Sequence, residues 1–193
     1  MKKAGVSKWV ILSLVIFLVV LILIVSGLVF YLLLGSADYT GVYEDRIVSG
    51  EIVNPVIGLS DDEAVLKFDE SFVYYLLVNI KAYNLHEAMF SDEIPRIEFY
   101  IDDVSYNAEI ADGEIDVEVG EINGEDIIIR TSALEGVKMI RDENYISDSF
   151  SSGASGIELV ADKSTLFAKG YLKIYSELTG GDITGDVISR FFD

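Results

Sequence analysis

An unbroken apolar block near the start is the feature that most limits how this 193-residue chain can fold. Residues Val10 to Leu34 are interrupted only by Ser13, Ser26 and Gly27. As a helix the block would rise about 37 Å at ~1.5 Å per residue, more than the ~30 Å hydrocarbon core of a bilayer. A cleaved signal peptide is less favoured, because its apolar part usually runs only about 7–15 residues. The sequence therefore predicts a transmembrane helix over residues 10–34, acting as an uncleaved signal anchor.

Charge is distributed unevenly around this block. The first eight residues hold three lysines and no acid, whereas all 33 acidic residues lie at Asp38 or later, and the net charge is −19. The positive-inside rule then predicts a single-pass protein of the cell membrane, with residues 1–9 cytoplasmic and the C-terminal domain extracytoplasmic. The acidic field repels phosphates, which excludes nucleic acid as a partner. An envelope protein remains an alternative partner at that location.

Composition argues against an enzyme. The chain has no cysteine and a single histidine, His86. Thiol nucleophiles and cysteine-based zinc sites are therefore excluded, and a histidine-containing triad is hard to build. His86 follows a helical pattern, where a cation favours the last carbonyl groups, so a structural role is preferred to general-base catalysis. We expect no catalytic residues, no metal site and no cofactor.

Two further motifs have simple structural interpretations. Seven acidic residues between Asp112 and Asp126 suggest calcium, but an EF-hand loop begun at Asp112 would need glycine where Val117 stands. A solvated strand face accounts better for alternating acids. The loop over residues 151–156 (SSGASG) lacks the spacing of a nucleophile elbow or of a phosphate-binding loop, so we interpret it as a connector.

Helical patterns follow a connector over residues 35–59. The sequence Ser60-Asp61-Asp62-Glu63 is a capping box, and apolar residues then recur with a period near 3.6 up to Tyr83. This predicts one long helix ending near His86, or two helices broken near Asp69. A second capping box opens at Ser132, and further helices are expected around residues 145–150 and after Ser164, the last one stopped by Gly180-Gly181.

Strand patterns occupy the middle of the domain. Apolar and polar residues alternate after Pro95, and Asp112-Gly113 is a strong hairpin signal. Asn123-Gly124 indicates a further turn, so we expect four antiparallel strands there and a fifth near residues 157–161. The predicted fold class is α+β: an N-terminal transmembrane helix followed by a mainly antiparallel five-stranded sheet packed with helices on one face. The domain covers residues 60–178, and residues 179–193 form an apolar C-terminal tail.

This order of elements resembles the sterol carrier protein 2 family. The resemblance is distant and covers residues 60–178, and it has no catalytic signature. The matching segments are a strand, an acidic-Gly hairpin, a strand ending in glycine, an Asp-Ile-x-Ile strand, a capped helix, a Gly-bearing loop, a strand and a final helix: Ile97–Ile101, Ile110–Gly113, Val117–Gly120, Asp126–Arg130, Ser132–Arg141, Gly153–Gly156, Ile157–Ala161 and Thr165–Leu178. It implies an apolar tunnel between sheet and helices that holds sterols, fatty acids or acyl chains.

Two hypotheses follow for function. The first is a membrane-anchored extracytoplasmic domain that binds a lipid or another apolar small molecule non-covalently. The second is a non-enzymatic envelope protein–protein interaction module with a solid core. For the first, the candidate cavity residues are aromatic or aliphatic: Phe72, Leu76, Phe99, Phe150, Phe167, Tyr171 and Phe191.

Overall fold

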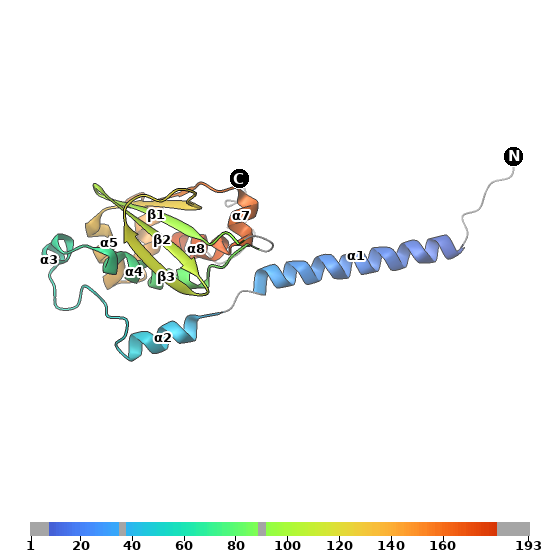
Figure 1. Cartoon of the computed structure of the whole chain (residues 1–193), viewed down its shortest axis with the longest axis horizontal. Helices are drawn as coiled ribbons and strands as arrows, with labels where there is room; N and C mark the ends of the chain where they lie inside the picture. The colour runs from blue at the N-terminus through green and yellow to red at the C-terminus, as the bar shows by residue number, and fades with distance from the viewer. Residues whose placement is uncertain (1–7, 35–37, 89–91, 181–193) are drawn as a thin grey trace. The chain divides into compact units, whose positions relative to one another are not determined.

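The structure is a computed structural model that describes residues 8–34, 38–88 and 92–180. The chain divides into two compact units, Met1–Ser36 and Ala37–Asp193. The first unit contains one helix, α1 (Lys8–Leu34) (Figure 1). The large apolar side chains of α1 between Leu12 and Val25 are all exposed.

The predicted transmembrane helix is corrected by the structure. Across the residues that are described, no helix is long and apolar enough to cross a membrane. The localisation expected from the charge asymmetry is untested and stays a prediction.

The second unit alternates short helices with five strands. Its helices are α2 (Thr40–Val48), α3 (Asp61–Leu66), α4 (Glu70–Asn79), η1 (Ala82–Asn84), α5 (Ala133–Arg141), α6 (Tyr145–Ser151), α7 (Lys163–Ala168) and α8 (Tyr171–Thr179). Its strands are β1 (Arg96–Ile101), β2 (Val104–Ala111), β3 (Glu114–Val119), β4 (Ile127–Thr131) and β5 (Gly156–Leu159). The α+β class and the five strands therefore agree with expectation.

The sheet is mixed, which corrects the expected mainly antiparallel arrangement. Its strand order is β3-β2-β1-β4-β5, and β1 pairs with β4 in parallel, Phe99 lying opposite Ile129. The other three pairings are antiparallel. The reason is the connection after β3. Instead of turning at Asn123-Gly124 as a hairpin, residues 120–126 carry the chain to the far side of β1.

The connection over residues 120–126 crosses the polar face of the sheet. Asn107 Nδ2 of β2 donates to Gly120 O at 3.1 Å, and Asp126 N donates to Arg96 O of β1 at 2.8 Å. Glu98, on the same face of β1, is only 3% exposed, and its Oε1 has no hydrogen-bond partner among the described residues. Burial, and secondarily the nearby charge of Glu125, raises the pKa of the Glu98 carboxyl.

Local signals account for most element ends. Ser60 and Glu63 form the expected reciprocal capping box, and the helix does break near Asp69, whose side chain caps α4. At the β2–β3 hairpin, Asp112 and Gly113 have φ angles of 51° and 80°, as a tight two-residue turn requires. The expected helix after Ser164 is instead capped by Asp162 and broken at Gly170, where φ is 88°.

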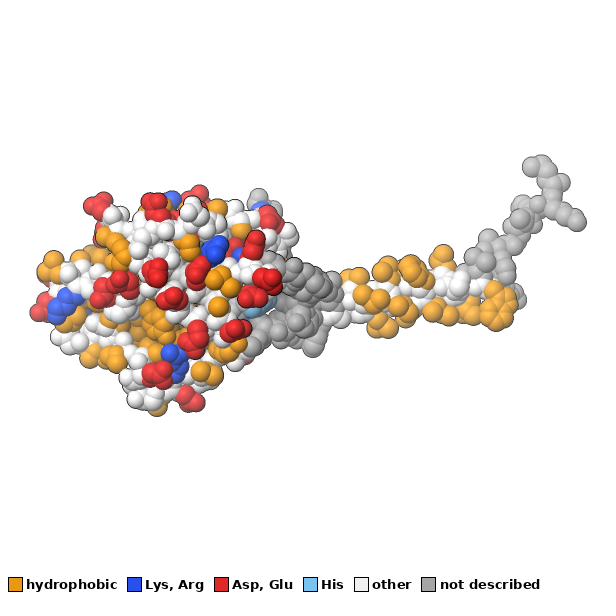
Figure 2. Space-filling model, viewed as in Figure 1, with side chains coloured by type: hydrophobic (Ala, Val, Ile, Leu, Met, Phe, Trp, Pro, Cys, Tyr) orange, Lys and Arg blue, Asp and Glu red, His pale blue; other side chains and the backbone are white. Residues whose placement is uncertain are grey.

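The core lies between one face of the sheet and the helices, as Figure 1 shows for α4 and α8 behind the strands. Tyr43, Ile52 and Val56, from the segment expected to be a connector, are also buried in it. The outer face carries many acidic side chains and few basic ones (Figure 2). Cross-strand neighbours such as Glu109 and Asp116 stand on this polar face, as their alternation indicates.

Candidate functional site

A small apolar cavity lies between the sheet and the helices. Its volume is about 10 Å³, close to the room that one water molecule needs. Strands β1 and β4 supply one wall, and helices α4, α5, α6 and α8 supply the rest. The lining is apolar except for one hydroxyl: Leu76, Ile80, Phe99, Ile129, Thr131, Met139, Phe150 and Leu178.

The mouth of the cavity is marked by side-chain exposure. Six of the eight lining residues are buried in the core, whereas Phe150 and Thr131 are only partly buried. Phe150 comes from α6, a helix of seven residues that packs against α8. Because these two residues are the least buried part of the lining, we infer that the cavity opens beside Phe150 and Thr131.

The structure brings together three of the seven candidate cavity residues. Leu76, Phe99 and Phe150 line the same cavity from three different elements. Phe72 is buried in the core and Phe167 packs partly buried against it, but neither lines the cavity. The two remaining candidates have separate explanations: Phe191 lies outside the described residues, and Tyr171 is engaged in a buried polar cluster.

Tyr171 is a polar core residue rather than a cavity wall. Its hydroxyl donates to Asp126 Oδ2 at 2.9 Å, with Arg96 O 3.2 Å away. Lys169 Nζ lies within hydrogen-bond distance of both Asp126 oxygens and of Ile94 O. Burial, followed by the charge of Asp126, raises the pKa of Tyr171 well above its ordinary value. This cluster joins the start of β4 to the break between α7 and α8.

Sequence reasoning missed the remaining cavity residues. Ile129 and Thr131 face the cavity because β4 pairs in parallel with β1, with Phe99 opposite Ile129 and Ile101 opposite Thr131. That pairing joins segments about 30 residues apart, and the strand pattern alone does not reveal it. Ile80 follows Leu76 by one helical turn, so periodicity was a usable signal for it.

Hydroxyl groups form a hydrogen-bonded chain that starts at the cavity mouth. Thr131 Oγ1 is 2.7 Å from Ser155 Oγ, which is 2.8 Å from Ser149 Oγ. Ser149 in turn donates to Glu135 Oε2 at 2.8 Å. Ser149 and Ser155 are both almost wholly buried. The one polar side chain of the cavity wall is thus linked to an ionisable group.

Glu135 ends this chain as a firmly held carboxylate. Lys138 Nζ lies 2.7 Å from its Oε1, and Tyr145 Oη donates to its Oε2 at 3.0 Å. These bonds, the one from Lys138 first, lower the pKa of Glu135. The predicted capping box at Ser132 is therefore half formed: Ser132 Oγ accepts from Glu135 N at 3.2 Å, while the Glu135 side chain turns to its tertiary partners.

The other candidate groups contact backbone or solvent. His86 Nδ1 lies 3.0 Å from the neighbouring Glu87 carbonyl, and His86 N donates to Lys169 O. Within the described ranges, no three His, Asp or Glu side chains are grouped so that they could hold a metal ion. Glu114, Asp116 and Glu118 alternate along the edge strand β3, and Asp112 lies in the turn before it.

Comparisons with known proteins add a weak structural likeness. No family model matches the chain, and no curated protein matches it. Among solved structures it is similar to one described as "UbiJ-SCP2 Ubiquinone synthesis protein", with 13% sequence identity over 60% of this chain and 90% of that chain, and a TM-score of 0.34. The description of that structure names SCP2, the family that the order of elements in this sequence resembles.

Proposed function

We propose that the domain binds a small apolar ligand or an acyl chain non-covalently, in the cavity between β1, β4 and the helices. The observation that carries the proposal is the lining, seven apolar side chains and the single hydroxyl of Thr131. Ligand sites are typically apolar hollows with a few polar groups that fix orientation. The proposal involves no covalent step.

Binding requires the cavity to expand, because its present volume holds no more than about one water molecule. Phe150 would swing outward with α6 and open the mouth beside Thr131. Met139 in the cavity wall has an unbranched, flexible side chain, which would change conformation to make room for the ligand. Each methylene of the ligand that leaves water contributes about 0.8 kcal/mol, which offsets part of the cost of opening the cavity.

The hydroxyl chain gives the bound ligand a direction. A polar head group would lie beside Thr131 at the mouth, and the apolar part would extend towards Leu76 and Ile80. Because Thr131 already bonds to Ser155, its hydroxyl is oriented before the ligand arrives. A carboxylic acid or alcohol with a short alkyl chain fits this arrangement better than a bare hydrocarbon.

Photo-crosslinking on the full chain tests this proposal directly. The probe is an alkyl carboxylic acid that carries a diazirine in its chain, and labelled peptides are identified by mass spectrometry. We expect labels on the segments that contain Leu76, Phe99 or Phe150, with unlabelled decanoic acid abolishing them. Labels confined to other segments, or unaffected by the competitor, would overturn the proposal.

A matched pair of substitutions sharpens the test. Phe150→Trp narrows the mouth and is expected to reduce competed labelling at least fivefold. Phe167→Trp makes the same change at a partly buried aromatic residue that packs against the core outside the cavity, and should leave labelling unchanged. Equal effects of the two substitutions would contradict an entry beside Phe150.

A second candidate function, protein–protein interaction, is favoured by a separate observation. Four large apolar side chains between α2 and the end of α3 are strongly exposed: Val48, Val53, Ile57 and Leu66. Where such residues form a contiguous patch, they are typical of a docking surface. Serine substitutions at Val48, Ile57 and Leu66 would then abolish chemical crosslinks to a protein partner and leave photo-labelling of the cavity intact. Retained crosslinks together with lost photo-labelling would exclude this function.

A further inference from the structure

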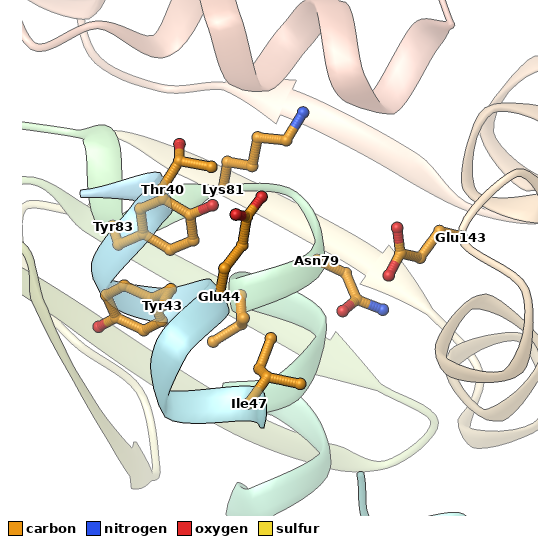
Figure 3. A pocket seen from close by; sticks show the side chains of 9 residues that line it. Thr40, Tyr43, Glu44, Ile47, Asn79, Lys81, Tyr83 and Glu143 are labelled. Atoms are coloured by element: carbon orange, nitrogen blue, oxygen red, sulfur yellow. The ribbon is translucent and has the colours of Figure 1, made fainter. Parts of the chain in front are cut away.

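A second pocket lies near the C-terminal end of α4 and differs in chemistry from the apolar cavity. Its volume is about 150 Å³, and α2, the end of α4, η1 and the α5–α6 connection surround it (Figure 3). Its lining mixes charged, amide, hydroxyl and apolar groups: Thr40, Tyr43, Glu44, Ile47, Val78, Asn79, Lys81, Tyr83 and Glu143. The apolar cavity shares none of these residues.

An unsatisfied donor lies at this pocket. Asn79 Nδ2 is buried and has no hydrogen-bond partner among the described residues. Asn79 is the last residue of α4, and Figure 3 shows its amide extending towards the side of the pocket where Glu143 stands. A buried donor left unpaired is unfavourable, so an acceptor atom of a ligand that reached Asn79 Nδ2 would be favoured.

Two carboxylates face the pocket from different elements. Glu44 comes from α2 and Glu143 from the connection before α6. Neither forms an ion pair within the described part of the chain. An ammonium group between them would be attracted by both charges, in a domain whose net charge is already strongly negative.

One cation is fixed at the same pocket. Lys81 adopts a left-handed backbone conformation with φ of 59°, which is unusual for a residue with a side chain. Its Nζ lies 2.7 Å from Glu177 Oε1, and this bond raises the pKa of Lys81. The lysine is therefore held charged at the pocket, where it complements an anionic group.

The remaining wall is formed mainly by aromatic and aliphatic side chains. The rings of Tyr43 and Tyr83 stack with their centroids 4.2 Å apart and their planes 12° from parallel. Tyr43 Oη donates to Gly113 O at 2.9 Å, which fixes the pair to the β2–β3 hairpin. Ile47 and Val78 complete a surface suited to a short hydrocarbon group.

We propose that this pocket binds a small zwitterion of the α-amino acid class. The ammonium group would lie between Glu44 and Glu143, and the carboxylate would accept from Asn79 Nδ2 and face Lys81. A short apolar side chain would contact the Tyr43–Tyr83 stack. A dry cavity of this volume holds benzene in another protein, so the ligand has about six to eight non-hydrogen atoms.

Isothermal titration calorimetry on the full chain, with L-alanine and L-valine as probes, tests the proposal. Each probe is compared with two truncated analogues: ethylamine and isobutylamine lack the carboxylate, and propionate and isovalerate lack the ammonium group. We expect saturable binding of at least one amino acid, and at least tenfold weaker binding of both of its analogues. No binding by either amino acid at 10 mM, an amine that binds as tightly as its amino acid, or an acid that does so, would overturn the proposal.

Substitutions assign the binding to this pocket. Glu44→Gln and Asn79→Leu are each expected to weaken amino acid binding at least tenfold. Asp45→Asn removes a charge from the next position of α2, an exposed residue that does not line the pocket, and should change affinity less than twofold. If Asn79→Leu impairs folding, as its thermal unfolding would reveal, Glu143→Gln replaces it. Unchanged affinity in Glu44→Gln would contradict the assignment even if the amino acid binds. Photo-labelling of the apolar cavity is a separate readout, so either proposal can fail alone.

Discussion

Lys169 Nζ lies 2.8 Å from Asp126 Oδ1 and 3.0 Å from Oδ2, and both side chains are at most 4% exposed. A buried pair of this kind is costly to break, because the remaining charge is left without compensation. Tyr171 Oη and Arg96 N, the latter at 2.8 Å, occupy further positions on the Asp126 carboxylate. The pair therefore connects β1, β4 and the α7–α8 break in one buried network.

We predict that Lys169→Met destabilises the full chain by about 3–5 kcal/mol, since it leaves Asp126 buried and unpaired. The measurement is the free energy of unfolding from urea titration monitored by tyrosine fluorescence. Lys67→Met, at an exposed position after α3, should change it by less than about 0.5 kcal/mol. Similar losses for the two variants would mean that the buried pair contributes no more than a surface lysine.

A substitution at Glu98 is expected to raise the free energy of unfolding instead of lowering it. We expect Glu98→Gln to stabilise the fold by about 1 kcal/mol at neutral pH, because it removes a charge from a buried carboxyl with an unpartnered oxygen. The folded state raises the pKa above the ordinary 4.5, so ionisation of Glu98 opposes folding. The gain should therefore be absent well below pH 4.5 and grow as pH rises through the folded-state pKa.

The control for Glu98 is Glu118→Gln, an exposed acid on the same face of the sheet. Urea titrations of both variants across the acidic range check the prediction. The prediction would be contradicted by a gain in Glu98→Gln that does not depend on pH, or by an equal gain in Glu118→Gln. Either result would show that burial of the ionised Glu98 carboxylate does not destabilise the fold.

Glu135 should respond to pH in the reverse direction. Its folded-state pKa is lowered by the bonds from Lys138, Ser149 and Tyr145, so its ionised form stabilises the fold. That contribution is fully present above the ordinary value of 4.5 and is lost as pH falls through the folded-state pKa. We expect Glu135→Gln to lower the free energy of unfolding by about 1–3 kcal/mol at neutral pH, with the loss shrinking below pH 4.5. A loss that is constant from pH 7 to pH 3 would contradict this account.

Gly→Ala substitutions at two helical positions separate the effect of helix propensity on stability from the effect of side-chain packing. A Cβ at Gly136 of α5 would lie 2.8 Å from Phe68 Cε2, whereas a Cβ at Gly41 of α2 would meet nothing within 4 Å. Gly41→Ala should therefore stabilise the chain by about 0.5–1 kcal/mol. Gly136→Ala should destabilise it by about 1–3 kcal/mol, because the ring must move.

Phe68→Leu tests the cause of the Gly136 effect. In that background the ring is absent, so Gly136→Ala should lose most of its cost in a double-mutant cycle. Thermal unfolding of the four variants measures the coupling. Additive effects would mean that the cost of Gly136→Ala does not come from the contact with Phe68.

Short-range features of the fold were predictable from the sequence because their causes are local. The capping box at Ser60, the helix break at Asp69 and the hairpin at Asp112-Gly113 each depend on residues within four positions of one another. The half-formed box at Ser132 shows the limit of such reasoning. There the Glu135 carboxylate accepts hydrogen bonds from Tyr145 and Ser149 instead of from the Ser132 backbone at the helix end.

Long-range features were not predictable in the same way. The parallel pairing of β1 with β4 depends on where the chain goes after Val119, and no residue near that point signals a crossover. The cavity residues Ile129 and Thr131 follow from that pairing, so they were missed with it. Leu76, Phe99 and Phe150 could be predicted from the sequence, because large apolar residues at periodic positions point to the interior whatever the strand order.

The crossover after β3 also limits the length of its own connection. Strands β3 and β4 are separated by three inter-strand spacings, or about 14 Å at ~4.8 Å each. The eight steps from Val119 to Ile127 span at most about 26 Å when extended at ~3.3 Å each, part of which is used to rise over the side chains of β1 and β2. With three residues deleted the reach falls to about 17 Å. That leaves little length for rising over the side chains of β1 and β2, so a sufficiently long connection is a condition for the observed strand order. A chain shortened further at this point would have only the free edge of β3 on which to form an antiparallel meander.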